Sequence, residues 1–61
     1  MNTITPEYAA ALAINAYHAY GSVTDHKNYA GLPMPGWYTL PPKIQEAWCA
    51  AVTQVSKDLA P

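Results

Sequence analysis

Arginine and phenylalanine are absent from this chain of 61 residues, and cysteine, glycine and charged residues are sparse. The only strongly basic side chains are three lysines, and the formal net charge is −1. Because proteins that bind duplex nucleic acid neutralise several phosphates with cationic side chains, that partner is disfavoured. Cys49 is the single cysteine, which excludes an internal disulfide. Together with the lack of a secretory signal pattern, a free thiol indicates a reducing cytoplasm.

Long apolar runs and catalytic motifs are missing as well. No stretch is long and apolar enough to predict a membrane-spanning helix. There is no Gly-rich phosphate-binding loop before a helix, no paired-carboxylate pattern and no serine–histidine signature. The four acidic residues are scattered along the chain, so no acid and base can be assigned. We therefore expect a protein that is not an enzyme and that holds no cofactor.

Apolar residues nevertheless make up 51% of the chain. Residues 1–61 can form one small helical domain, and a chain of this length buries only about 60% of the surface that its unfolded form exposes. Eleven of the apolar residues are alanine, so large core side chains are few. Small proteins compensate with disulfides, metals or oligomerisation. The first two have no support here, so we expect a homo-oligomer.

A first helix is predicted over residues 6–20. Thr5 suits the N-cap, Pro6 the first helical position and Glu7 the positive end of the helix dipole. Gly21 is expected to end the helix. Polar side chains occupy only one narrow stripe, at Glu7, Asn15 and His18. Because a helix that is apolar on most of its circumference is buried on more than one side, this is a second reason to expect a homo-oligomer.

A second helix is predicted over residues 42–59, opened by Pro41 and Pro42. Its apolar residues recur at helical spacing and form one stripe expected to face the core, at Ile44, Ala47, Trp48, Ala51, Val52, Val55 and Leu59. The intervening residues 21–40 have no helical period but are too apolar for a solvated linker, so we expect an ordered loop with a short extended or 3₁₀ piece. The predicted fold is all-α, with two helices joined by a long ordered loop and assembled as a homo-oligomer.

Two sets of residues could carry chemistry, one as metal ligands and one as a nucleophile, but each also has a simpler structural explanation. His18, Asp25 and His26 could ligate a transition metal, but no two of them lie at the i, i+4 spacing of a zinc-binding helix. Solvated side chains are the preferred interpretation. Cys49 could be a nucleophile if a neighbouring base activated it. Its position on the flank of the polar face favours a small packing residue or a free surface thiol, so we expect neither a metal nor a catalytic residue.

The aromatic residues are the most informative feature, since all seven are tyrosine or tryptophan. Each combines a flat apolar face with a hydrogen-bonding tip, a type enriched at contact surfaces. Stacking on such rings can hold a nucleobase, and a lysine or histidine can contact a phosphate. The expected ligand-binding residues lie at the end of the first helix and in the loop that follows: Tyr17, His18, Tyr20, Lys27, Trp37 and Tyr38. Core packing is the alternative for these rings, and it is the expected role of Trp48.

Two segments resemble known proteins. They are Ala13-x-x-Ala16-Tyr17-His18-x-Tyr20 and, after a Gly-containing loop, Leu40-Pro41-x-x-Ile44-Gln45-x-Ala47-Trp48-x-Ala50-Ala51. The pattern resembles small proteins encoded by tailed phages and prophages, and it is distantly similar to the ryanodine-receptor-type (RyR) repeat domain. The resemblance covers roughly residues 9–59, but Ala19 replaces the usual acidic residue after the histidine and the chain is shortened. It implies a non-enzymatic phage protein with a nucleotide-like ligand.

Several functions stay open from the sequence. The first is a small-ligand-binding protein that sequesters a nucleotide-derived immune signal to counter host defence, with sites at subunit interfaces. The second is a protein-binding inhibitor of a host defence complex whose aromatic loop is the hot spot. The third is a structural or regulatory phage subunit without a small ligand. The lack of arginine counts against the first, since lysines and helix N-termini would have to hold phosphates. An enzyme is the fourth. The expected location is the cytoplasm, which is that of the host cell if the protein is phage-encoded.

Overall fold

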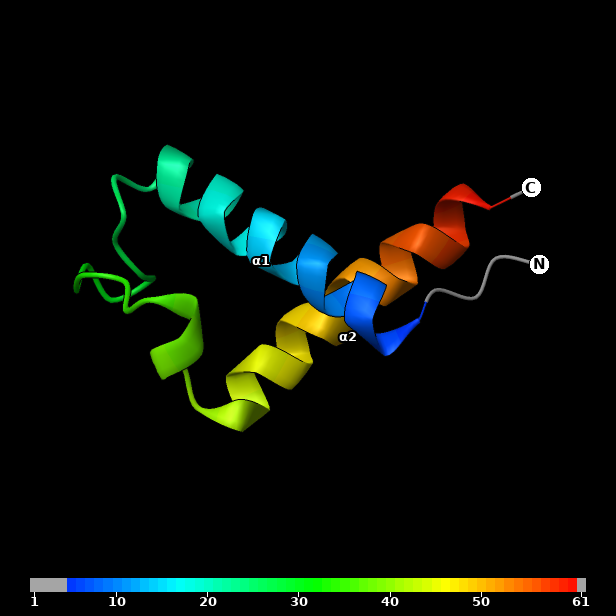
Figure 1. Cartoon of the computed structure of the whole chain (residues 1–61). Coiled ribbons are helices and arrows are strands. Elements are labelled where there is room, and N and C mark those ends of the chain that lie inside the picture. Colours follow the sequence, from blue (N-terminus) through cyan, green and yellow to red (C-terminus); the bar gives the residue numbers. More distant parts are fainter. Residues whose placement is uncertain (1–4, 61) are drawn as a thin grey trace.

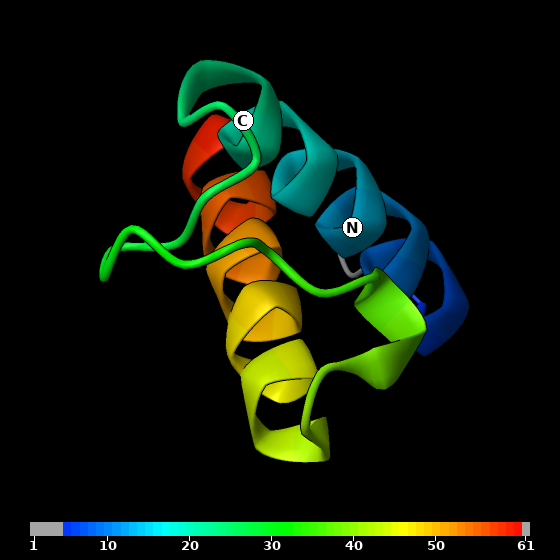
Figure 2. The same ribbon diagram turned by 90° about the vertical axis from the view of Figure 1, so that its left-hand side faces the viewer.

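Two helices of equal length dominate the computed structural model, which describes residues 5–60. Helix α1 spans Pro6–Val23, the 3₁₀ helix η1 spans Trp37–Thr39, and α2 spans Pro42–Leu59. The two long helices cross, and the loop and η1 lie between their diverging ends (Figure 1). Figure 2 shows the loop passing across this open side. The lead-in predicted for residues 1–4 lies outside the described residues, as does residue 61.

The predicted all-α fold with an ordered loop is confirmed, including the start of each helix. Thr5 is the N-cap of α1, where its hydroxyl accepts a 3.1 Å hydrogen bond from the Tyr8 amide, and Pro6 occupies the first turn. Pro41 precedes α2 in an extended conformation, and Pro42 is its first residue. Neither helix in the described part of the chain is long and apolar enough to cross a membrane.

Gly21 does not end α1, contrary to the prediction, because it serves a packing role inside the helix. A Cβ at this position would lie 3.0 Å from Nδ1 of His26 and 3.4 Å from the side chain of Met34. The helix ends instead before Asp25 and His26, which both have φ of 58°. Aspartate and histidine are among the non-glycine residues that adopt this left-handed conformation most readily. The His26 amide then donates to the Gly21 carbonyl at 2.7 Å, a bond typical of helix C-caps.

The core is small and lies where α1, η1 and α2 meet. Its buried residues come mainly from α1 and from the segment around η1: Ala9, Ala13, Tyr17, Trp37 and Leu40. Half-buried apolar side chains surround this cluster, at Ile14, Met34, Trp48, Cys49 and Val52. No large side chain in the described range is fully buried. The hydrophobic effect therefore stabilises this monomer only modestly, as expected for its size.

Helix α2 is rotated about its axis relative to the prediction that its whole apolar stripe faces the core. Of the stripe, only Trp48 and Val52 are half-buried, and no residue of α2 is fully buried. The side that faces α1 instead adds small side chains, at Cys49, Thr53 and Ser56. Because small residues let two helices approach closely, α1 with its buried alanines packs against this flank. The rest of the apolar stripe is left exposed.

Candidate functional site

An aromatic cluster connects the two helices to η1. Tyr17 lies at its centre, with its ring centroid 5.7 Å from that of Trp37 and 5.6 Å from that of Trp48. Tyr20 packs on the other side of Trp48 at 5.8 Å. All three pairs are edge-to-face, a geometry that contributes roughly 0.5–1.5 kcal/mol per pair beyond burial. The cluster therefore fixes the end of the loop against both helices.

Two hydrogen bonds from side chains reinforce this attachment. The Tyr17 hydroxyl donates to the Pro35 carbonyl at 2.5 Å, and the Gln45 amide donates to the Trp37 carbonyl at 2.9 Å. Burial raises the pKa of the Tyr17 phenol above its ordinary value of 10.0, so the hydroxyl keeps its donor proton to a higher pH than an exposed tyrosine does. Tyr17 and Trp37 are both buried, and each takes part in one of these hydrogen bonds. They therefore hold the loop in place and present almost no surface to a ligand.

The loop itself is held by an ordered network around Asn28. The Asn28 carboxamide oxygen accepts hydrogen bonds from the amides of Ala30 at 2.9 Å and Leu32 at 3.0 Å. The Asn28 amide donates to the Leu32 carbonyl at 2.8 Å, and Gly31 turns the chain with φ of 78°. We call residues 28–32 the loop tip. Its backbone is held by its own bonds and does not depend on burial of its side chains.

The loop tip presents apolar side chains outward. Tyr29 is 96% exposed and Leu32 is 61% exposed. Lys27 and Pro33 close the tip through an isolated antiparallel bridge. Neighbouring exposed apolar side chains can form a patch that marks an interaction site, and Tyr29 and Leu32 lie three residues apart on the same tip. Tyr29 and Leu32 were not among the residues expected to bind a ligand, although Asn28 and Gly31 on either side of Tyr-Ala are a turn signal that could have located this tip.

The structure divides the six residues expected to bind a ligand. Tyr17 and Trp37 are buried in the aromatic cluster, and Tyr20 is brought to its edge through Trp48. Tyr20 is itself 37% exposed, and the remaining three residues are exposed as well, at His18, Lys27 and Tyr38. His18 is near the cluster, 6.2 Å from the ring of Tyr17, whereas Tyr38 in η1 is 83% exposed. The six side chains thus occupy two settings, one structural and one solvent-facing, and a common ligand pocket stays a prediction.

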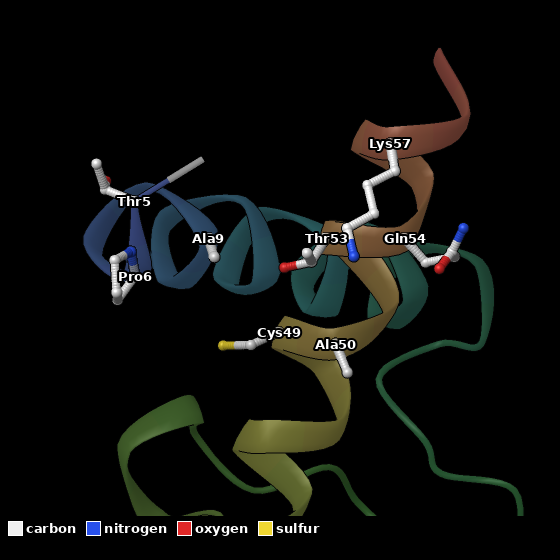
Figure 3. A pocket seen from close by; sticks show the side chains of 8 residues that line it. All are labelled: Thr5, Pro6, Ala9, Cys49, Ala50, Thr53, Gln54 and Lys57. Atoms are coloured by element: carbon white, nitrogen blue, oxygen red, sulfur yellow. The ribbon is translucent and has the colours of Figure 1, made fainter. Parts of the chain in front are cut away.

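A hollow lies away from these residues, where the start of α1 crosses α2 (Figure 3). It encloses about 550 Å³ and is lined by Thr5, Pro6, Ala9, Cys49, Ala50, Thr53, Gln54 and Lys57. The Cys49 thiol and the Thr53 hydroxyl point toward the first turns of α1, and Lys57 extends along α2 toward Thr53. Cys49 is half-buried and packs against the core, which agrees with the packing role expected for it. The hollow is open to solvent, and Lys57 is the only cation among the described residues that line it.

Metal-binding side chains do not gather anywhere in residues 5–60, where no three of His, Cys, Asp and Glu lie together. His26 is turned toward Gly21 by the helix cap described above, while His18 lies on the exposed side of α1. The structure thus offers no ready-made metal site in this range.

No family model, curated protein or solved structure matches this chain.

Proposed function

We propose that this chain is a non-enzymatic protein-binding protein that inserts its loop tip into a partner protein. The observation that supports this proposal most directly is Tyr29, whose ring is 96% exposed on a loop with a hydrogen-bonded backbone. Binding normally costs free energy to order the contacting side chains and loops. A tip that is already ordered in the free protein avoids much of that cost.

The chemistry of the tip indicates what the partner must supply. Tyr29 and Leu32 need an apolar recess, and the phenol needs one hydrogen-bonding group at its end. Lys27 adjoins the tip and forms no ion pair with another residue of the 5–60 range, so it is available to an acidic group at the edge of the recess. Tyrosine is among the residues that most often dominate protein–protein affinity. From the resemblance to phage proteins described above, we infer that the partner is a host defence protein in the host cytoplasm.

The test begins with the purified chain and a purified partner identified by cross-linking from cells that express it. Titration calorimetry should give a dissociation constant in the micromolar range or tighter for the native chain. Tyr29→Ala should weaken binding by at least about 30-fold, since hot-spot residues contribute roughly 2 kcal/mol or more. Leu32→Ala should weaken it less, because it presents a smaller apolar surface.

Tyr8→Ala is the matched control for Tyr29→Ala. Tyr8 is another exposed tyrosine, at 56%, but it lies on α1 and outside the loop. We expect its replacement to leave the affinity within about twofold. Equal losses for the two variants, or a loss for Tyr8→Ala alone, would show that the loop tip is not the binding surface.

Small-ligand binding is the second candidate, because the hollow between the helices has a suitable size. Ligand pockets usually enclose about 300–1,000 Å³ and place a few polar groups in an apolar lining. Thr5, Thr53 and Lys57 could supply hydroxyl and ammonium contacts to a nucleotide-like ligand, while Ala9 and Cys49 supply the apolar part. The openness of the hollow and its single lysine make this candidate weaker than protein binding.

A thermal-shift panel of nucleotides and sugar nucleotides separates the two candidates. A ligand present at about 100 times its dissociation constant adds roughly 2.7 kcal/mol to stability and raises the melting temperature. If a nucleotide stabilises the native chain but not Thr53→Val, the hollow is the site. If His18→Ala and Tyr38→Ala are the variants that lose the effect, the site is the one expected from the sequence.

A further inference from the structure

We propose that a second copy of this chain covers the outward side of α2, forming an antiparallel helix pair. We define the α2 face as Ile44, Trp48, Ala51, Val55 and Leu59. This face shares no residue with the loop tip, so the proposal is independent of the proposed binding function. It gives the self-association expected from the sequence a definite surface and a definite orientation.

The α2 face is apolar along its whole length. Val55 is 55% exposed and Leu59 is 80% exposed, although both belong to the most regular apolar stripe in the sequence. No charged residue belongs to the face, since the acidic and basic side chains of α2 lie on its flanks and opposite side. The face also continues the monomer core, because Trp48 is half-buried by Tyr17 and Tyr20 and exposes the rest of its ring.

The accessible surface of the monomer is larger than its mass predicts. The chain exposes 4630 Å², whereas a compact monomer of its 6.6 kDa mass exposes roughly 3,900 Å². The radius of gyration of 12.4 Å likewise exceeds the roughly 10.5 Å of a compact domain of this length. The monomer is thus less compact than a typical globular chain of its size, as expected for two crossing helices that leave one side of α2 exposed.

The residue spacing on the α2 face fits an antiparallel pair. Ile44, Trp48, Ala51 and Val55 follow each other at intervals of four, three and four residues, the repeat of a two-helix seam. If the two helices cross at Ala51, then Ile44 lies opposite Leu59 of the second copy, and Trp48 lies opposite its Val55. Large residues then meet at both ends of the seam. The small Ala51 stands at its centre, where the helices approach most closely.

Charges on one flank of the face favour the same arrangement. Lys43 precedes the face at its start, and Asp58 flanks it near its end. Neither forms an ion pair with any other residue described in the structure; Asp58 only accepts a hydrogen bond from Gln54. When two copies pair in antiparallel orientation, the flank that carries Lys43 and Asp58 lies on the same side of the interface in both copies. Lys43 of each copy then lies near Asp58 of the other. The pairing is isologous and closed, as most homodimers are.

The outer side of α1 is the competing surface for a second copy. It exposes Tyr8 and Val23, but the polar Asn15 and His18 interrupt it. The α2 face has no such interruption, and it alone continues the core through Trp48. These two differences favour α2 as the contact.

Sedimentation equilibrium tests the proposal on the native chain and on two variants, each of which replaces one alanine of α2 by glutamate. The native chain at about 50 µM should have twice the 6.6 kDa mass of one copy. Ala51→Glu should shift the dimer dissociation constant by at least 100-fold and leave a monomer or an unfolded chain. Ala50→Glu makes the same change one residue away, at an exposed position outside the α2 face, and should remain dimeric.

Cysteine cross-linking keeps the test valid if Ala51→Glu does not fold. In a Cys49→Ala background, Ala51→Cys should form a disulfide-linked dimer under mild oxidation, because position 51 lies at the crossing point. Ala50→Cys in the same background should not. A native chain that sediments as a 6.6 kDa monomer at 50 µM overturns the proposal. A dimer that survives Ala51→Glu and cross-links from Ala19→Cys on α1 overturns it too, in favour of the α1 surface.

Discussion

Helices α1 and α2 are both 18 residues long, yet they use their apolar residues in opposite ways. In α1 the apolar residues surround most of the helix, and a row at every fourth position is buried: Ala9, Ala13, Tyr17 and Gly21. In α2 the apolar residues form one clean stripe, and none of them is fully buried. The helix with the weaker amphipathic pattern supplies more of the core.

The contrast teaches that residue size decides the contact as much as residue polarity does. The buried row of α1 consists of small residues apart from Tyr17, so another segment can approach its backbone closely. The α2 side that meets it also contains small side chains, such as Cys49 and Thr53. Ile44, Val55 and Leu59 of the α2 stripe are then left exposed, whereas Trp48 also packs against Tyr17 and Tyr20 of α1. The exposed residues belong to the surface that we assign to a second copy.

The largest expected effect is a loss of stability when a tryptophan is removed, and it should be greater in the core around η1 than on the apolar stripe of α2. Trp37→Ala removes a buried indole and should cost about 3–5 kcal/mol, enough to unfold so small a domain. Trp48→Ala should fall at the lower end of this range, since Trp48 is only half-buried. Urea unfolding followed by far-ultraviolet circular dichroism measures both. A Trp37→Ala chain that keeps its helicity and its urea midpoint would contradict the assignment of Trp37 to the core.

A smaller effect sharpens the comparison by testing one alanine on each helix. Ala13 lies on α1 and is fully buried by the residues that pack against it. Ala13→Leu should therefore overpack this contact and lower the free energy of unfolding by about 1–3 kcal/mol. Ala50 is exposed on α2, so Ala50→Leu should change stability by no more than about 0.5 kcal/mol. Thermal unfolding at matched protein concentrations compares the two. Equal effects would mean that close approach of the helices does not depend on the small residues of α1.

Local features of the fold could be predicted because their physical cause is local. Thr5 and Pro6 start α1 and Pro42 starts α2, since capping and the fixed proline φ act within one turn. The end of α1 could not be predicted in the same way. Gly21 is compatible with either ending a helix or allowing close packing inside one, and only the positions of His26 and Met34 decide between these roles.

The candidate site depended even more on tertiary contacts. A tyrosine or tryptophan suits a core and a binding surface equally well, so Tyr17 and Trp37 could not be distinguished from Tyr38 by residue type. In the structure the first two are buried and Tyr38 is exposed. Likewise, a helical period locates an apolar stripe but does not say whether another segment of the same chain covers it. For α2 that cover comes from α1 and the segment around η1, and it leaves Ile44, Val55 and Leu59 exposed.

The smallest predicted effect concerns the hydrogen bond between Tyr17 and the Pro35 carbonyl, which ties the loop to α1. Tyr17→Phe keeps the ring in the aromatic cluster but removes the donor, so it should cost about 1 kcal/mol at neutral pH. Burial raises the pKa of the Tyr17 phenol above its ordinary value of 10.0, so the folded chain retains this proton at a pH where the unfolded chain has released it. The stability that depends on this proton is complete below about pH 10 and is lost as the pH rises through the folded-state pKa. The native urea midpoint should therefore fall more steeply between pH 9 and 11 than that of Tyr17→Phe. Because the exposed tyrosines are common to both chains, the difference between the two curves isolates Tyr17, and parallel curves would show that its proton does not stabilise the loop.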